Sequence, residues 1–203
     1  MPTSPSEWDA KHRLAAQVPS AEPAGIVRGL LPLLPMGQAL DLACGTGRHT
    51  LLLAARHQQV TAVDWSATAL EILESQARAT QSPVRRIQSL ESAGRSSRGG
   101  IDLVQANLEK IAIPERSYDL ILCIRYLQRT LFPLICRALR PGGMLLFETY
   151  TQAQLQFDGG PRHPDHLLEA GELRRAFPEL SVLFYRELCA GQGIASLAAQ
   201  QRG

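Results

Sequence analysis

Two carboxylates and a loop of small residues are the groups in this sequence whose types and spacing suggest chemistry. Asp41 lies inside an apolar run, and the loop Ala43-Cys-Gly-Thr-Gly47 follows directly. Asp64 closes the next apolar run, 23 residues after Asp41. Burying a charge in an apolar strand is costly unless it is paired, so Asp41 needs a partner, which a ligand ammonium would supply. An acid at the position of Asp64 is placed to accept hydrogen bonds from ribose hydroxyls.

A strand, a small-residue loop and a helix must position these groups. We expect the strand at residues 38–43 and the helix at about 47–57. Glycine suits such a loop because the backbone must turn sharply and approach a ligand without a Cβ in the way. The free N–H groups at the start of the helix favour a polar or negative ligand group. This order is typical of the first turn of a nucleotide-binding βαβ unit.

Apolar runs and helical patterns alternate along the rest of the chain, which predicts a parallel α/β sheet in a single domain of 203 residues. Further strands are expected at 60–64, 101–105, 118–124, 144–149, 180–186 and 193–199. Further helices are expected at 6–16, 23–34, 66–80, 131–139 and 171–177, with Ser66 as the N-cap of the fourth helix in chain order. Residues 81–100 are rich in Arg, Ser and Gly, and we expect an exposed, mobile insertion there.

The motif Asp41-Leu-Ala-Cys-Gly-Thr-Gly47 followed by Val63-Asp64 resembles that of the class I S-adenosylmethionine (SAM)-dependent methyltransferases, with Ala43 where the first glycine often stands. The turn Leu139-Arg-Pro-Gly-Gly143 accompanies this motif, and the run 161–173 is similar to small bacterial methyltransferases of the tellurite-resistance type. The resemblance implies a three-layer αβα Rossmann-like sandwich. Its seven-stranded, mostly parallel sheet would have the order 3-2-1-4-5-7-6, with strand 7 antiparallel.

The same resemblance implies the limits of two regions of the chain and the residues that bind each part of the cofactor. Residues 1–35 would form an N-terminal helical cap over the cofactor pocket, and 36–203 would form the SAM-binding domain as one compact unit. Asp41 and the loop would hold the amino-acid end of SAM, Asp64 the ribose, and Trp65, Asn107 and Leu108 the adenine. The expected cofactor-binding residues are Asp41, Ala43, Cys44, Gly45, Gly47, Asp64, Trp65, Ser66, Asn107, Leu108, Cys123 and Arg125. S-adenosylhomocysteine (SAH) would be the product.

Ligands in open α/β sheets bind outside the carboxyl ends of the strands, so polar residues after the later strands are candidates for the acceptor side. These substrate candidates are Tyr126, Arg129, Tyr150 and Arg162. Methyl transfer is an in-line displacement that needs alignment and exclusion of water, so no protein nucleophile is required. A general base, if one is used, would be His12 or His163. His163 and His166 lack a supporting ligand cluster, so no metal site is expected.

The acceptor is expected to be a small molecule, and the arginines favour an anionic one. The Asn/Asp-Pro-Pro-aromatic motif of DNA amino-methyltransferases and a Pro-Cys nucleophile are both missing. Residues 81–100 contain no aromatic residue, which argues against an RNA-binding surface. The net charge of +2 implies no polyanionic partner. RNA or protein acceptors, and hence an RNA methyltransferase, remain alternatives.

Two other function classes stay open. A non-catalytic, regulatory SAM-binding module would show the same cofactor motif without turnover. An NAD(P)-dependent oxidoreductase would need a Tyr-x-x-x-Lys pair, and neither lysine of the sequence follows a tyrosine at that spacing. The four cysteines form no Cys-x-x-Cys pair, the first residues are no secretory signal, and no run has membrane-spanning length. A cytoplasmic protein that does not bind membranes is therefore expected.

Overall fold

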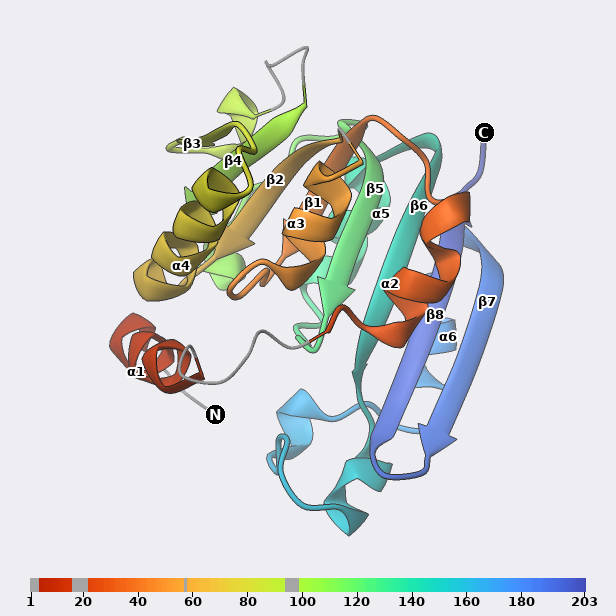
Figure 1. Ribbon diagram of the computed structural model, residues 1–203. Coiled ribbons are helices and arrows are strands. Elements are labelled where there is room, and N and C mark those ends of the chain that lie inside the picture. The colour runs from red at the N-terminus through yellow and green to blue at the C-terminus, as the bar shows by residue number, and fades with distance from the viewer. Residues whose placement is uncertain (1–3, 16–21, 57, 94–98) are drawn as a thin grey trace.

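The structure is a computed structural model of the chain, and it describes residues 4–15, 22–56, 58–93 and 99–203 (Figure 1). The strands within these residues are β1 (Gln38–Leu42), β2 (Gln59–Asp64), β3 (Val84–Arg86), β4 (Gly100–Gln105), β5 (Tyr118–Ile124), β6 (Leu139–Tyr150), β7 (Leu180–Cys189) and β8 (Gly193–Gln201). The α-helices are α1 (Pro5–Ala15), α2 (Gly25–Leu30), α3 (Arg48–Ala54), α4 (Ala67–Ala79), α5 (Leu131–Ala138) and α6 (Glu172–Arg175). Among the described helices, none is both long enough and apolar enough to cross a bilayer.

The strands form one sheet in the order β3-β4-β2-β1-β5-β6-β8-β7. Neighbouring strands from β3 to β6 are parallel, and β8 runs antiparallel to both β6 and β7. The expected order 3-2-1-4-5-7-6 is confirmed for seven of these strands. The same register places Asp41 beside Ala62 on β2 and Leu122 on β5.

The sheet differs from the expectation by an eighth strand, β3, which lies at the edge next to β4 and within residues 81–100. Two hydrogen bonds from Arg85 to the buried Asp102 hold this edge strand, with N···O distances of 2.5 and 3.1 Å. Two of its three residues are arginines, so the sequence shows no apolar run at this position. The expectation of a mobile insertion is therefore wrong for residues 84–86, while residues 94–98 lie outside the described residues.

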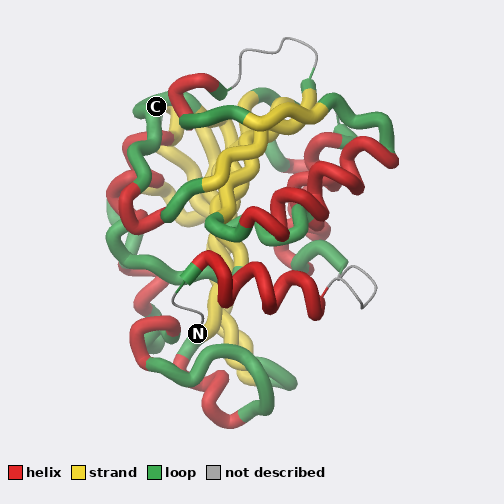
Figure 2. The backbone as a smooth tube through the Cα atoms, turned by 90° about the vertical axis from the view of Figure 1, so that its left-hand side faces the viewer, coloured by secondary structure: helices red, strands yellow, loops and turns green. Residues whose placement is uncertain are grey.

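Helices cover both faces of the sheet, as the ribbon and the tube turned by 90° show (Figures 1 and 2). One core cluster joins the sheet to α2, α3 and α4 through side chains such as Val27, Leu53 and Leu73. A second cluster on the opposite face joins it to α5 and α6 through side chains such as Ile135 and Leu173. This sandwich fixes the carboxyl ends of the parallel strands on one edge of the molecule, where the candidate residues lie.

Capping and proline chemistry explain where several helices begin and end. The Ser66 hydroxyl accepts a hydrogen bond from the Ala69 N–H at 3.1 Å, which confirms it as the N-cap of α4. The second helix is shorter than the expected 23–34, because α2 gives way to a 3-10 turn over Leu31–Leu33 that contains Pro32. α1 begins at Pro5, where the hydroxyl of Ser4 accepts a hydrogen bond from the Glu7 N–H at 3.4 Å.

Candidate cofactor and substrate site

The loop after β1 turns back on itself through three residues in the left-handed region. Ala43, Gly45 and Gly47 have φ values of 54°, 56° and 85°. A Cβ on Gly47 would lie 2.2 Å from Cδ1 of Leu73 on α4, so glycine permits this close approach of loop and helix. Ala43 adopts the conformation that a glycine would adopt, at a cost of about 1 kcal/mol. Alanine is small enough for this position, where the resemblance would place a glycine, and its backbone adopts the required conformation.

Asp64 links the end of β2 to this loop. Its side chain accepts hydrogen bonds from the Gly45 N–H at 2.8 Å and the Ser66 N–H at 2.9 Å. Burial raises the pKa of the carboxyl, and these backbone donors oppose that effect. A carboxylate has about four lone-pair positions, so two remain for a ligand. Asp64 therefore fits the ribose hydroxyls of SAM.

Asp41 lies next to Asp64 on the neighbouring strand and is 1% exposed. Thr50 Oγ1 donates a hydrogen bond to its carboxyl at 2.7 Å. Burial raises the pKa of Asp41 to about 7, and the charge of Asp64 adds to that effect while Thr50 and Arg48 oppose it. A cation at this loop would favour the ionised carboxylate, which fits the ammonium of SAM.

Asp41→Asn should change the pH dependence of stability. Between pH 4 and pH 7 the folded wild type keeps a proton on Asp41 that the unfolded chain has released, so its free energy of unfolding falls as the pH rises. The loss amounts to a few kcal/mol by pH 8, and the asparagine variant lacks it. Urea unfolding should therefore show that the free energy of unfolding of the variant, relative to that of the wild type, is higher at pH 8 than at pH 4.5. An equal difference at both values would contradict a buried, protonated Asp41.

Helix α1 lies over the loop and the start of α4. Asp9 accepts hydrogen bonds from Ser66 Oγ at 2.5 Å and from the Thr68 N–H at 3.0 Å. His12 Cε1 would be 3.5 Å from a Cβ built on Gly45, and burial lowers the pKa of its imidazole while Asp64 opposes that effect. Trp8 stacks on His12 with ring centroids 5.9 Å apart. These contacts agree with a cap over the loop, although the division at residue 35 and a catalytic role of His12 stay predictions.

The residues expected near adenine occupy the ends of β2 and β4. Asn107 Oδ1 accepts a hydrogen bond from the Glu109 N–H at 2.9 Å, which leaves its amide N–H groups and one lone pair for a ligand. Leu108 is buried and Trp65 is half-buried. Cys44 and Cys123 are 6% and 0% exposed, so their side chains pack in the core rather than face a pocket. The assignments of these five residues to the cofactor stay predictions.

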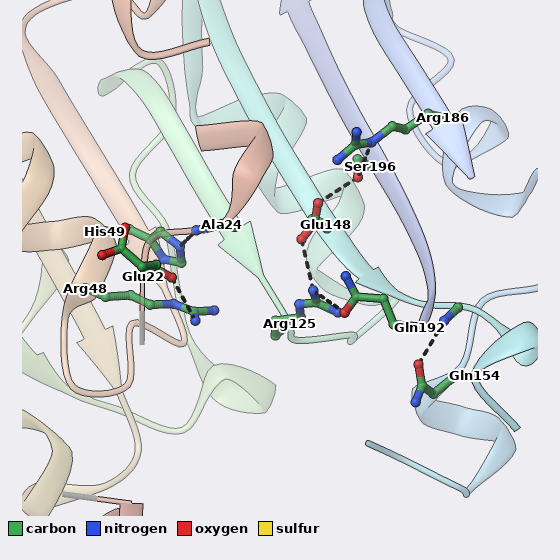
Figure 3. Close-up of polar contacts among 11 residues, drawn as sticks. Glu22, Ala24, Arg48, His49, Arg125, Glu148, Gln154, Arg186, Gln192 and Ser196 are labelled. Atoms are coloured by element: carbon green, nitrogen blue, oxygen red, sulfur yellow. Dashed lines mark hydrogen bonds and ion pairs between the residues drawn. The ribbon is translucent and has the colours of Figure 1, made fainter. Parts of the chain in front are cut away.

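Arg125 follows β5 and is fixed by residues of β6 and of the turn between β7 and β8. It has a φ of 64°, and its N–H donates to the Glu148 carbonyl oxygen at 2.6 Å. Its Nη2 donates to Gln192 Oε1 at 2.9 Å and lies 3.4 Å from Glu148 Oε1 (Figure 3). Its Cζ is 4.7 Å from the centre of the Tyr150 ring. Glu148, itself 2% exposed, also accepts a hydrogen bond from Ser196 Oγ at 2.7 Å.

Two other arginine candidates hold the segment after β6 instead. Arg129 pairs with both carboxylate oxygens of Glu172, at 2.6 and 2.9 Å, and donates to the carbonyls of Asp165 and Leu167. Arg162 donates to the carbonyl oxygens of Leu155 and Phe157. These contacts show that both guanidinium groups stabilise the segment after β6. A role of either arginine in binding substrate stays a prediction.

The remaining candidates also have local partners. The Tyr126 hydroxyl donates to Gln128 Oε1 at 2.6 Å, and burial raises the pKa of that tyrosine. His163 caps a 3-10 turn and lies 3.5 Å from Asp165 in an exposed position, so its role as a base also stays a prediction. Across the described ranges, no group of three or more His, Cys, Asp or Glu side chains is placed to hold a metal ion.

The segment after β6 is joined to the β7–β8 hairpin through Gln154, which is 3% exposed. Gln154 Oε1 accepts a hydrogen bond from the Gly193 N–H at 2.9 Å (Figure 3). The Thr151 N–H donates to the Gly193 carbonyl oxygen at 3.0 Å. Gln192, the neighbour of Gly193, is the residue that reaches Arg125. This side of the site is therefore one connected structure.

Sequence reasoning missed Arg48, Thr50, Glu148, Gln154 and Gln192. Glu148 directly follows the apolar run 144–147, a signal like the one that identified Asp41 and Asp64, so the sequence could have indicated it. Gln154 and Gln192 are uncharged polar residues whose sequence neighbours form no recognisable motif, and only the contact between their distant segments gives them a role.

Comparison with known proteins agrees with this geometry. Residues 40–147 match the family model described as a methyltransferase domain. The trans-aconitate 2-methyltransferase of Deinococcus radiodurans is 28% identical over 193 residues, which cover 87% of this chain and 66% of that protein. The fold is shared with TehB from Haemophilus influenzae (TM-score 0.72, 17% identity, 90% of this chain and 64% of that one). It is also shared with a SAM-dependent methyltransferase from Methanosarcina mazei (TM-score 0.63, 18% identity, 90% and 99%).

The family match covers the glycine loop, both carboxylates and the strand order that brings them together. The chain therefore belongs to the class I SAM-dependent methyltransferases, and it is an enzyme that uses SAM as its cofactor.

Proposed function

We propose that this methyltransferase acts on a small-molecule acceptor, which binds beyond the carboxyl ends of β1, β5 and β6. The observation that carries the proposal is that this end is bounded on two sides (Figure 1). α1 lies over the glycine loop through His12 and Asp9. The β7–β8 hairpin contacts Arg125 through Gln192, and it contacts the segment after β6 through the hydrogen bond between Gly193 and Gln154. A macromolecular acceptor would have to displace one of these elements.

The cofactor assignments form part of the proposal. Asp64 would hold the ribose hydroxyls, and Asp41 with the glycine loop would hold the amino-acid end. When bound, SAM supplies an activated methyl group for an in-line displacement. The chain's own task is to align the acceptor with that group and to exclude water, which supplies most of the acceleration in such reactions. The buried, hydrogen-bonded positions of Asp41 and Asp64 support a rigid cofactor side.

The Deinococcus relative supports a small acceptor, because its name states methylation of trans-aconitate. This chain spans 66% of that protein at 28% identity, so the relative's own substrate is only a candidate here.

Turnover tests the proposal directly. The purified protein with SAM should form SAH in the presence of trans-aconitate or another member of a panel of small organic acids. Total RNA and total protein should give no SAH above the rate without acceptor. Methyl incorporation into RNA or protein, with none into the small-molecule panel, would overturn the proposal. SAH binding without turnover on any of these acceptors would instead favour a regulatory SAM-binding module.

A further inference from the structure

One guanidinium nitrogen of Arg125 is buried without a hydrogen-bond partner among the described residues. Nη2 contacts Gln192 and Glu148, whereas Nη1 has no acceptor within reach in the described chain. A buried donor that lacks an acceptor is destabilising, and such groups in folded proteins call for an explanation. The side chain as a whole is 23% exposed, so Arg125 is not sealed within the core.

A second guanidinium lies close to the first. Arg48, the residue after Gly47, is half-buried and donates to the carbonyl oxygen of Glu22 at 3.3 Å. Burial lowers the pKa of Arg48, and the positive charge of Arg125 lowers it further. Figure 3 shows the Arg48 side chain pointing toward Arg125 from the other side of the strand ends. Two like charges held this close favour an anion between them.

The nearby acidic groups do not balance these charges. Glu148 pairs with Arg125 at 3.4 Å and neutralises one of the two guanidinium groups. Asp41 has its pKa raised to about 7 by burial, so near neutral pH it carries only part of a charge. His49 adds none, because burial lowers its pKa to about 3. Glu148 therefore balances one of the two guanidinium charges and Asp41 balances the other only in part, so the pair keeps a net positive charge.

We propose that Arg125 and Arg48 together bind a carboxylate group of the methyl acceptor, an inference that rests on the proposed function. The flat guanidinium fork matches a carboxylate in shape and charge. A net positive charge of no more than one suits a carboxylate monoanion better than a phosphate group, which carries about −1.5 to −2 at neutral pH.

The neighbours of Arg125 act as positioning residues in this scheme. Gln192 and Glu148 hold one edge of the guanidinium, and the Tyr150 ring lies against its face. They leave Nη1 as the edge without a partner in the described chain. The φ of 64° at Arg125 is uncommon for a residue with a side chain, and such backbone conformations cluster where a functional group must be aimed.

Binding of citrate to the SAH-saturated protein tests the inference, with triethyl citrate as the uncharged control. Calorimetry should show binding of citrate and none of the triester. Arg125→Met should weaken citrate binding by at least about tenfold, and Arg48→Met should weaken it in the same direction. Arg78→Met serves as the matched control, because Arg78 is an exposed arginine on α4, and it should leave citrate affinity unchanged.

Two further measurements make the result decisive. The resemblance placed Arg125 among the cofactor-binding residues, whereas this inference places it on the acceptor side. SAH affinity, measured first, distinguishes the two roles, and on the acceptor side it should be the same within about twofold in Arg125→Met and the wild type. Because that variant leaves Glu148 buried without its arginine, the Arg125→Met/Glu148→Gln double variant provides a second, charge-balanced form whose fold is checked by circular dichroism. Failure of the wild type to bind SAH would overturn the proposed function.

Four outcomes, in each of which the wild type binds SAH, would overturn this inference alone. Citrate that fails to bind, or binds Arg125→Met as well as the wild type, would show that these arginines hold no acceptor carboxylate. A loss of SAH affinity in Arg125→Met would assign them to the cofactor's own carboxylate. Tighter binding of inorganic phosphate than of citrate would show that the two arginines prefer a phosphate group to a carboxylate.

Discussion

Replacing Asp64 with alanine should weaken SAH binding by well over tenfold. The substitution removes the acceptor proposed for two ribose hydroxyls, each hydrogen bond to a charged group being worth about 1.5–3 kcal/mol. It also leaves the N–H groups of Gly45 and Ser66 without the carboxylate that they contact at 2.8 and 2.9 Å. Loss of these two bonds loosens the glycine loop itself, so the effect on affinity exceeds that of the ligand contacts alone. Isothermal titration calorimetry measures it directly.

Two further variants make this result specific. Asp165→Ala removes an exposed carboxylate from the segment after β6 and should leave the SAH affinity unchanged. Asp64→Asn keeps one oxygen for hydrogen bonding and should lie between alanine and the wild type. An Asp64→Ala protein that folds normally and binds SAH as tightly as the wild type would remove Asp64 from the cofactor site.

Gly193→Ala should be the most destabilising of the glycine-to-alanine substitutions in the β7–β8 hairpin. A Cβ at this position would lie 2.2 Å from the Gln154 nitrogen and 2.4 Å from the Ala153 carbonyl carbon. Backbone atoms cannot rotate away as a flexible side chain does, so the hairpin and the segment after β6 must separate. We expect the free energy of unfolding to fall by about 3 kcal/mol, at the upper end of overpacking effects. Chemical denaturation followed by circular dichroism measures the change.

Gly191→Ala is the matched control for this prediction. Gly191 lies in the same hairpin with a φ of 70° and nothing within 4 Å of an added Cβ, so only backbone strain of about 1 kcal/mol is expected. Gly193→Ala should also reduce methyl transfer, because Gln192 next to it contacts Arg125. Equal stability losses in the two alanine variants would show that the contact between Gly193 and Gln154 is not rigid.

Local signals were sufficient to predict most of the elements and the placement of Asp41 and Asp64 on neighbouring strands. The run Tyr118–Ile124 is almost wholly apolar, and it forms the buried central strand β5 with the expected bounds. Ser66 caps α4 as its residue type predicts. Asp41 interrupts one apolar run and Asp64 ends the next, and these two runs form the adjacent parallel strands β1 and β2. In each case, the information lies within a few neighbouring residues.

Contacts between distant segments account for what the sequence did not predict. The strand β3 pairs with β4, and its Arg85 forms an ion pair with the buried Asp102, an acid 17 positions away on β4. Arg125, Arg129 and Arg162 are chemically alike in the sequence. Only their neighbours distinguish them, because Glu172 and four backbone carbonyls surround the last two, while Arg125 keeps one buried N–H group without a partner among the described residues. The electrostatic interaction between Arg48 and Arg125 likewise arises because the fold brings together two positions that are far apart in the chain.

A crystal structure of the protein with SAH bound is the most direct test of the central claim that Asp41, Asp64 and the glycine loop form the cofactor site. The account predicts the ribose hydroxyls within hydrogen-bonding distance of Asp64 and the amino-acid end beside the loop, with the sulfur directed toward the side of Arg125. SAH bound elsewhere, or bound here with its ribose away from Asp64, would contradict it.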